Sequence, residues 1–522
     1  MAGCFEGNAP QGTHLSILRN AAPRDLSCAL LPDQSAPRYV CNMVRMVLMP
    51  LVLFWLNAGA QSVGPASANP VKADSTGKLE FILNPASAGL IFSQEQGENR
   101  ARTDLHFRGA FSARVHRRKG RGHLTMDAYQ GEGLPMLRAM EAGFDRRHGQ
   151  GKLATRMRGR WDAQVLPSVG LSLGRDTLHD GWGRRSLFRG RHVAPVSFLQ
   201  TVIDGGGRLR YRHRIETLQG APSMFCSSAE LGDPRFWTPP TGAIRGKIER
   251  MVVSHRLEVD FSPRLTGALW GAVVWNVRGG NRIFEPHYLL PLTSLRPTEY
   301  AQGSEDNALV GMEGRFQLGD LKGPEKYLYG QILLDELIVS EILGSTGWWG
   351  NKYALLGGIC WSYPQGGWRL EMSGARPWTY SHFTPTSAYI HGLTPLAHPL
   401  GANFLEASAQ GQWKKDGWQL YGRLTASTRG DDPSGDAPTG SLPQVGDIDR
   451  LQDTFGWLNG TARAFLLAQL DLSHKVGFGA NDHMRVFLRS EFQSIQTAEE
   501  RTRFLRLTVG LRSTAPWFGA DW

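Results

Sequence analysis

The chain has 522 residues, of which 41% are hydrophobic and 20% charged, and it contains 62 glycines and 16 tryptophans. This apolar and aromatic content excludes a disordered chain and a coiled coil. The formal net charge is +11, with no lysine-rich tail, so we expect no nucleic acid among its partners. The length fits two or three domains, or one large β-barrel.

An apolar run near the N-terminus, residues 46–56, follows Arg45 and precedes the small residues Ala58 and Ala60. This pattern is typical of a cleaved secretory signal peptide, and the run is too short to span a bilayer, which takes about 20 residues. We therefore predict a signal peptide over 43–60, with cleavage after Ala60. A short buried helix behind a true N-terminal extension is the alternative.

Residues 1–42 are expected to be an unstructured, over-extended start, and residues 61–522 to form one exported β-barrel domain. Cys226 and Cys360 are the cysteines of this domain, and their wide separation fits neither a disulfide framework nor a zinc site. We expect no cofactor and no metal.

Apolar and polar residues alternate with a period of two along much of this domain, which predicts β-strands. Within residues 105–115, Leu105 and Phe107 point to one side, whereas His106 and Arg108 point to the other. The same alternation predicts strands over 156–165, 209–217, 251–261, 265–277, 310–318, 418–426, 484–493 and 503–511.

Two features favour a membrane barrel over a soluble β-sandwich. Several strands exceed the five or six residues usual in globular sheets. Their polar faces carry rows of arginines, which a hydrated lumen can accept and a sandwich core cannot. We predict an all-β protein, a single-chain transmembrane antiparallel β-barrel of about 16–18 strands with short helical elements near one end. The alternative is a sandwich whose arginine faces are solvated.

Three segments lack the strand pattern. Residues 131–151 predict a turn or a short helix, and residues 335–343 a helix that could plug or flank a barrel end. Residues 428–452, rich in Asp, Gly and Pro, predict a long exposed loop.

Four segments between residues 170 and 405 carry recognisable motifs. They are GRD through GWGRRSLF (174–188), FEP through GSEDNAL (284–309), YGQILLDE through GWWGNKY (329–353), and RPWTYSH through PLAHPLGAN (376–403). In this order they resemble the bacterial outer-membrane family of the capsule assembly protein Wzi and the gliding-motility protein RemB of Bacteroidetes.

The resemblance implies an outer-membrane barrel of a Gram-negative bacterium with about eighteen strands and no catalysis. It implies a role in binding or organising capsular or other surface polysaccharide. The alternative that it implies is a gliding-motility or adhesion component that works with other envelope proteins. Outer-membrane lipid and lipopolysaccharide are further expected partners.

The arginine rows are the candidate ligand site, because clustered guanidinium groups attract carboxylate or phosphate. The lumen-facing arginines predicted to bind an acidic polysaccharide are Arg156, Arg158, Arg160, Arg208, Arg210, Arg212 and Arg214. The alternative is internal pairing with lumen acids, for which the candidates are Asp162, Glu216, Glu258 and Asp260.

Other clusters are weaker candidates. His382, His391 and His398 lack metal-ligand spacing and are expected to bond to loop backbone. Three aspartates lack the order of a calcium loop and are expected in a solvated loop; they are Asp431, Asp432 and Asp436. A secreted all-β glycoside hydrolase would need paired carboxylates, for which the candidates are Glu285, Glu299, Glu305 and Asp306.

Overall fold

The structure is a computed structural model, in which contacts divide the chain into Met1–Ser67 and Ala68–Trp522. Within the second unit it describes residues 78–95, 102–117, 120–130, 146–148, 153–219, 248–277, 285–289, 306–321, 323–383, 386–392, 394–432, 438–447, 450–478 and 481–513. The predicted signal peptide, 43–60, and the leader, 1–42, lie outside these residues.

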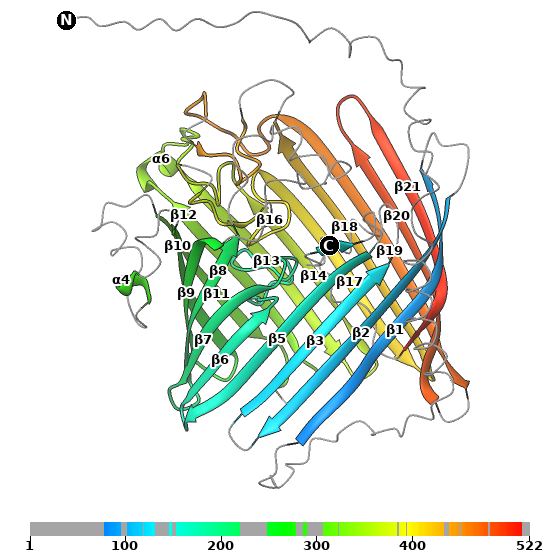
Figure 1. Ribbon diagram of the computed structural model, residues 1–522. Coiled ribbons are helices and arrows are strands. Elements are labelled where there is room, and N and C mark those ends of the chain that lie inside the picture. Colours follow the sequence, from blue (N-terminus) through cyan, green and yellow to red (C-terminus); the bar gives the residue numbers. More distant parts are fainter. Residues whose placement is uncertain are drawn as a thin grey trace, which may run out of the picture. The chain divides into compact units, whose positions relative to one another are not determined.

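One large antiparallel sheet dominates the described residues (Figure 1). Its long strands are β1 (Lys78–Glu95), β2 (Arg102–Arg117), β3 (Gly120–Gln130), β5 (Leu153–Leu166), β6 (Val169–Asp176), β7 (Val196–Asp204), β8 (Leu209–Gln219), β9 (Ile248–Asp260), β10 (Leu265–Asn276), β11 (Asn307–Gln317), β12 (Lys326–Glu336), β13 (Lys352–Tyr363), β14 (Gly366–Ala375), β17 (Phe404–Lys415), β18 (Trp418–Asp431), β19 (Thr461–Phe478), β20 (Asn481–Gln496) and β21 (Arg501–Ser513).

The sheet closes on itself. Each long strand pairs with the next long strand in the chain, and β21 returns to β1, with Leu511 opposite Ala88. Of the 19 strands in this sheet, the three-residue β4 (Arg146–His148) pairs with β5 alone, and the other 18 form the closed ring. The predicted antiparallel barrel of 16–18 strands is confirmed, and the two-sheet sandwich is wrong.

The connections differ at the two ends of the barrel. Two-residue turns join β5 to β6 and β17 to β18; in the latter, Asp416 and Gly417 have φ of 48° and 81°, as a type I′ turn requires. Long connections, such as 177–195, 376–403 and 432–460, alternate with these turns and gather at the other end. We call these ends the short-turn end and the long-loop end.

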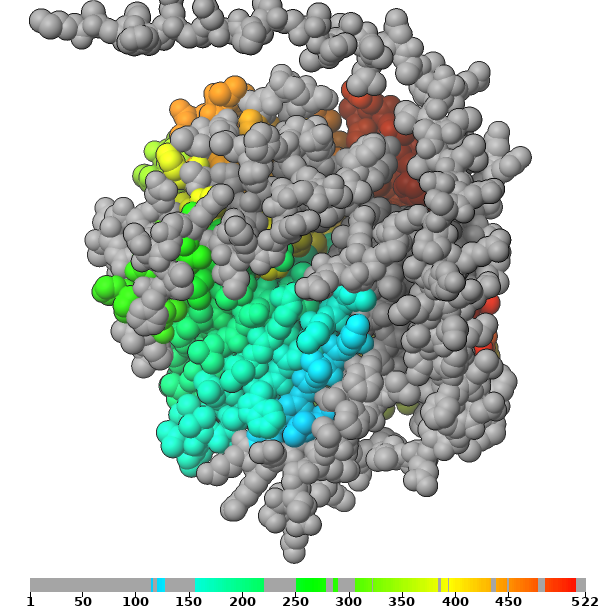
Figure 2. Space-filling model, viewed as in Figure 1, coloured from blue at the N-terminus to red at the C-terminus, as the bar shows by residue number. Residues whose placement is uncertain are grey.

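Side-chain burial is inverted relative to a soluble protein. On β5, Arg156 is 9% exposed whereas its neighbour Met157 is 56% exposed. On β21, Arg506 is 6% exposed and Leu505 54%. Polar side chains thus face the lumen and apolar ones face outward, as in a barrel whose surroundings are hydrocarbon. In Figure 2 the residues of β5 to β8 form one continuous patch of the outer surface.

The non-strand predictions are only partly right. Helix α6 covers Val339–Leu343, while Asp335 and Glu336 belong to β12, because Glu336 still pairs with Lys352 of β13. Within the predicted turn or helix at 131–151, residues 146–148 form strand β4, which pairs with β5, so the prediction is wrong there. The other residues of this range lie outside the described residues.

The remaining short elements belong to the long connections. Residues 428–431 extend β18 rather than opening the predicted loop, and two short strands, β15 (Ile390–His391) and β16 (Thr394–Pro395), form a separate hairpin. Helix α4 covers Pro286–Leu289. Among the described residues no helix is long and apolar enough to cross a membrane.

Candidate functional site

The connection between β6 and β7, residues 177–195, enters the lumen; we call it the lumen segment. The backbone N–H of Trp182 donates to Glu313 of β11 at 2.9 Å, and that of Arg184 donates to Glu371 of β14 at 2.6 Å. Both carboxylates lie on the inner face of the wall and are buried. The lumen segment is therefore fixed to the wall through its own backbone.

Ion pairs hold the same segment at two distant parts of the wall. Arg185 pairs with Glu406 of β17, and Arg189 lies 3.1 Å from Glu216 of β8. Strands β9 to β14 separate β8 from β17 along the ring. The lumen segment consequently crosses the lumen from one wall to another.

Apolar packing completes this crossing. Phe188 of the lumen segment stacks on Trp270 of β10, with ring centroids 4.9 Å apart. Gly311 on β11 allows this approach, because a Cβ there would lie 2.4 Å from the Phe188 ring. The main hydrophobic core thus includes the lumen segment and the inner face of the wall.

Two arginines of the β8 row contact the lumen segment. Arg212 and Arg214 both pair with Asp180, which is 1% exposed, and Arg214 Nε also donates to Glu216 at 2.8 Å. Charge-assisted hydrogen bonds of this kind compensate buried guanidinium groups. These two arginines neutralise acids of the protein itself.

The other two arginines of the β8 row lie closer to the short-turn end. Arg210 lies 2.6 Å from Glu258 and its side chain is 53% exposed. Arg208 precedes β8 and is exposed in the turn, so it is not part of the strand as predicted. Asp260, a predicted arginine partner, instead accepts a hydrogen bond from Thr266 at 2.6 Å.

The β5 row is also engaged with carboxylates. Arg160 Nε donates to Asp162 at 2.6 Å, and Arg158 lies 3.9 Å from Asp176. Arg156 is buried at 9% exposure. Internal pairing, the alternative raised from the sequence, therefore occurs on both strands, while ligand binding by these arginines stays a prediction.

A group of aromatic and cationic side chains lies at the long-loop end. Trp348 and Trp349 have ring centroids 5.7 Å apart, and the Arg450 guanidinium lies 3.6 Å from the Trp349 ring centroid. Trp457, 39% exposed, makes an edge contact with Tyr353 at 6.0 Å. We call Trp348, Trp349 and Arg450 the aromatic–arginine cluster; Tyr353 and Trp457 form a separate pair beside it in the chain.

The loops that carry this cluster are tied together. The backbone N–H of Trp349 donates to the carbonyl of Asp453 at 3.0 Å. Lys352, fully buried, donates through Nζ to Asp447 at 2.5 Å. The connections 337–351 and 432–460 therefore hold the aromatic rings in one arrangement before any ligand arrives.

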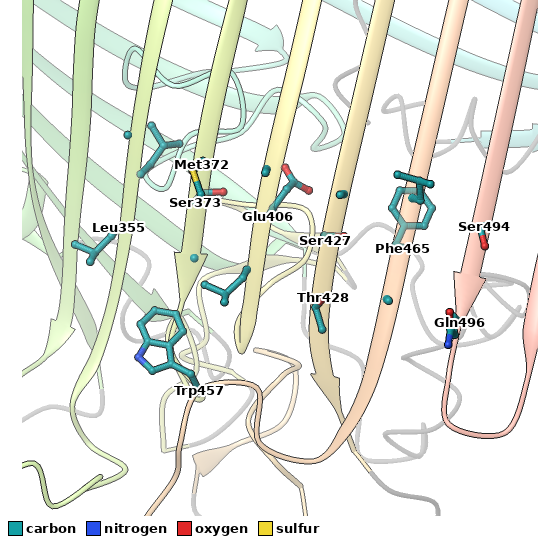
Figure 3. A pocket seen from close by; sticks show the side chains of 18 of the residues that line it. Leu355, Met372, Ser373, Glu406, Ser427, Thr428, Trp457, Phe465, Ser494 and Gln496 are labelled. Atoms are coloured by element: carbon teal, nitrogen blue, oxygen red, sulfur yellow. The ribbon is translucent and has the colours of Figure 1, made fainter.

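A groove of about 860 Å³ lies against the strands next to Trp457 (Figure 3). Exposed Leu355, Met372 and Leu405 line it together with small residues such as Gly374. Because its apolar lining is continuous with the outward-facing side chains of β13, β14 and β17, the groove belongs to the outer face of the barrel.

The three candidate histidines do not converge. His382 lies 3.7 Å from Glu336, and His398 lies 3.3 Å from Glu406. His391 Nδ1 accepts the backbone N–H of Gln219 at 3.2 Å, and burial lowers its pKa to about 3, with nearby arginines adding to the effect. No group of three or more His, Cys, Asp or Glu side chains among the described residues is arranged around a metal position.

The candidate calcium-loop acids also have protein partners. Asp431 lies on β18, not in a solvated loop, and pairs with Arg429 and with Arg463 at 2.6 Å. Asp432 accepts the backbone N–H of Thr439 at 2.7 Å. Asp436 lies outside the described residues.

Two of the four candidate hydrolase carboxylates, Glu285 and Asp306, fall within the described residues, while Glu299 and Glu305 lie outside them. The Tyr288 hydroxyl donates to Asp306 at 3.1 Å, and Asp306 is 2% exposed. Asp306 thus has a structural hydrogen bond and little contact with solvent.

No family model matches the chain, and no curated protein matches its sequence. Among solved structures it is similar to Wzi of Escherichia coli, described as a carbohydrate-binding outer-membrane β-barrel involved in group 1 capsule assembly. The two are 13% identical, with 91% of this chain and 89% of that chain covered and a TM-score of 0.48.

The chain is also similar to two Pseudomonas aeruginosa proteins. OccD3 is 11% identical, with 85% of this chain and 95% of that chain covered and a TM-score of 0.43. OccK2, solved with glucuronate, is 10% identical, with 85% and 100% covered and a TM-score of 0.44. The barrel assignment of the present chain rests on its own strand pairing.

Proposed function

We propose that the protein is an outer-membrane barrel of a Gram-negative bacterium that binds or organises capsular or other surface polysaccharide and catalyses no reaction. The observation that carries this proposal is the crossed lumen. With the lumen segment fixed on both β8 and β17, the long-loop end is the part of the barrel available to a polymer. The aromatic–arginine cluster lies there.

The apolar outer face supports the membrane location. Outward residues such as Met157, Leu269 and Met372 are more than half exposed, which is unfavourable in water and favourable in lipid. Outer-membrane lipid and lipopolysaccharide are then direct neighbours of the wall. A signal peptide at 43–60, cleaved after Ala60, is part of the same proposal.

The chemistry of the cluster suits an acidic polysaccharide. Tryptophan rings offer flat apolar faces with a polar edge, which match the C–H face of a sugar ring. Arg450, next to Trp349, can pair with a uronate or phosphate group. The exposed Arg208 and Arg210 lie toward the short-turn end, so they would bind an anionic group separately from the cluster.

Membership of the Wzi and RemB family belongs to this proposal as well. The four motif segments support it, and with it the alternative of a gliding-motility or adhesion component. The experiment that separates the roles is binding of purified protein to a glycan array. A component that acts only through other envelope proteins would bind no glycan.

The cluster is tested with Trp349→Ala combined with Arg450→Gln. We expect affinity for the array glycan to fall at least about tenfold, whereas Trp418→Ala, an exposed tryptophan at the short-turn end, retains it. Unchanged affinity in the first variant would remove the cluster from the proposal. If glycan binding survives the combined Arg208, Arg210 and Arg212→Gln substitutions, the arginine row is not part of the binding site. Release of shortened glycan would contradict the non-catalytic role.

A further inference from the structure

Two histidines face each other on the outer side of the wall. His213 on β8 is directly opposite His255 on β9 in the strand register. Both alternate with the inward-facing arginines Arg212, Arg214 and Arg256, so both imidazoles point away from the lumen. Their ring centroids are 5.0 Å apart.

This part of the outer face is covered by the protein itself. Helix α4 lies outside the strands, beside β9 (Figure 1). Tyr288 of α4 packs against Val253, Val273 and Trp275, and all four side chains are fully buried. His213 is 5% exposed under this cover. His213 is therefore shielded from bulk solvent, whereas His255 is partly exposed.

Each imidazole has one nitrogen occupied and one unused. The Tyr211 hydroxyl and His255 Nδ1 form a hydrogen bond of 2.6 Å. His213 is hydrogen-bonded to the backbone of Tyr288. The Nε2 atoms of both histidines are buried and have no hydrogen-bond partner among the residues that the structure describes.

Each ring meets one requirement of a metal-binding histidine, and the rings make an edge contact with an interplanar angle of 62°. A ligating imidazole characteristically uses its second nitrogen for a hydrogen bond that fixes the ring, leaving the first for the metal. Two imidazoles that bind one ion at about 2.0 Å have ring centroids roughly 5 Å apart, which is the separation of His213 and His255. Buried polar nitrogens otherwise find a partner in native proteins.

We propose that His213 and His255 bind one divalent transition-metal ion through their Nε2 atoms. Imidazole favours Zn²⁺, Ni²⁺ and Cu²⁺ over Mg²⁺ or Ca²⁺. Water completes the coordination, since the protein supplies two ligands. Tyr211 and Tyr288 are positioning residues, because they orient the rings without touching the ion. The site is independent of the aromatic–arginine cluster.

The test uses full-length protein without a histidine tag, in detergent, titrated with Cu²⁺. We expect one equivalent to bind with an electron paramagnetic resonance spectrum split by two nitrogens. His213→Gln and His255→Gln should each reduce the splitting to one nitrogen, and the double variant should lose the site. Tyr211→Phe should keep both nitrogens and weaken binding about tenfold.

His474→Gln is the matched control, since His474 lies on the outer face of β19 beside Trp418, away from the pair. It should leave the spectrum unchanged. Heat-dependent gel migration reports whether each variant is folded. If the double variant fails to fold, the wild-type and Tyr211→Phe spectra still decide. A wild-type spectrum without nitrogen splitting, or a folded double variant that keeps the bound ion, would overturn the proposal.

Discussion

Asp180 joins two arginines of β8 to the lumen segment. It is 1% exposed and receives both Arg212 and Arg214. Asp180→Asn would remove the shared anion of the partly buried Arg212 and the buried Arg214, and Arg214 would keep Glu216. We therefore expect the barrel to lose about 3 kcal/mol of stability. The urea midpoint of unfolding in detergent measures this loss.

Asp453→Asn is the control for that substitution. Its side chain is 81% exposed and pairs with Arg450 at 3.5 Å, and exposed pairs contribute about 0–1 kcal/mol. Equal midpoints for Asp180→Asn and wild type would show that the arginines find other acids.

Lowering the pH should destabilise the folded protein through His192. This side chain lies in the lumen segment, its Nε2 donates to the Pro395 carbonyl at 2.8 Å, and burial lowers its pKa to about 3. The unfolded state, with a pKa of 6.5, therefore binds the proton first as pH falls. The contribution of neutral His192 is complete above pH 6.5 and declines by about 1.4 kcal/mol per pH unit toward pH 3.

Urea unfolding at pH 7.5 and pH 5 tests this expectation. Wild type should be less stable at pH 5, and His192→Gln should show a smaller difference between the two pH values. His474→Gln, on the barrel wall, should keep the wild-type difference. An identical pH response in His192→Gln and wild type would contradict the assignment.

Residue-level prediction succeeded where alternation alone decides orientation. The period of two predicts that Arg156 and Arg214 face the lumen, and both are buried there. The expected acids Asp162, Glu216 and Glu258 pair with arginines. The roles of Asp180 and Glu313 were not predicted from the sequence. Their roles arise from a loop that folds back into the barrel, and a polar loop sequence carries no signal of that path.

At the scale of elements, the lumen segment should control conductance. In planar bilayers we expect wild type to show no steady current. Arg185→Gln with Arg189→Gln removes the ion pairs to β17 and β8, which should produce frequent openings. Arg264→Gln, in an exposed turn, is the control. A steady wild-type current equal to that of the double variant would show that the segment does not obstruct passage.

Strands were predictable and loops were not. A strand such as β8 is specified locally, by the alternation within its own residues. The expected helix over 335–343 was too long, because pairing of Glu336 with Lys352 extends β12 against the helical pattern. Tertiary hydrogen bonding decides such borders, and sequence periodicity does not include it.

At the scale of the whole molecule, the two barrel ends should have different exposure in cells. Short turns of bacterial barrels face the periplasm and long loops the exterior. In a Cys226→Ser background, Ser345→Cys at the long-loop end should react with a membrane-impermeant maleimide on intact cells. Ser262→Cys at the short-turn end should react only after lysis. The reverse pattern would invert the orientation.

Barrel closure was predictable as a class but not in its register. Sequence alternation indicated many strands and a wet interior, whereas the meeting of β1 with β21 depends on the accumulated tilt of every strand between them. The pairing of Ala88 with Leu511 is a global result. The path of the lumen segment is also a global result, because this segment contacts β8, β11, β14 and β17.

The seam between β1 and β21 also constrains the order of assembly. It joins residues more than 400 positions apart, from Ser87 with Arg512 to Glu95 with Phe504, a closure that costs about 5 kcal/mol of chain entropy. The lumen segment can reach its partners from the side only while that seam is open, and after closure it can enter only through the long-loop end. Until the last hairpin is made, the unpaired edge of β1 has to be kept apart from other strand edges.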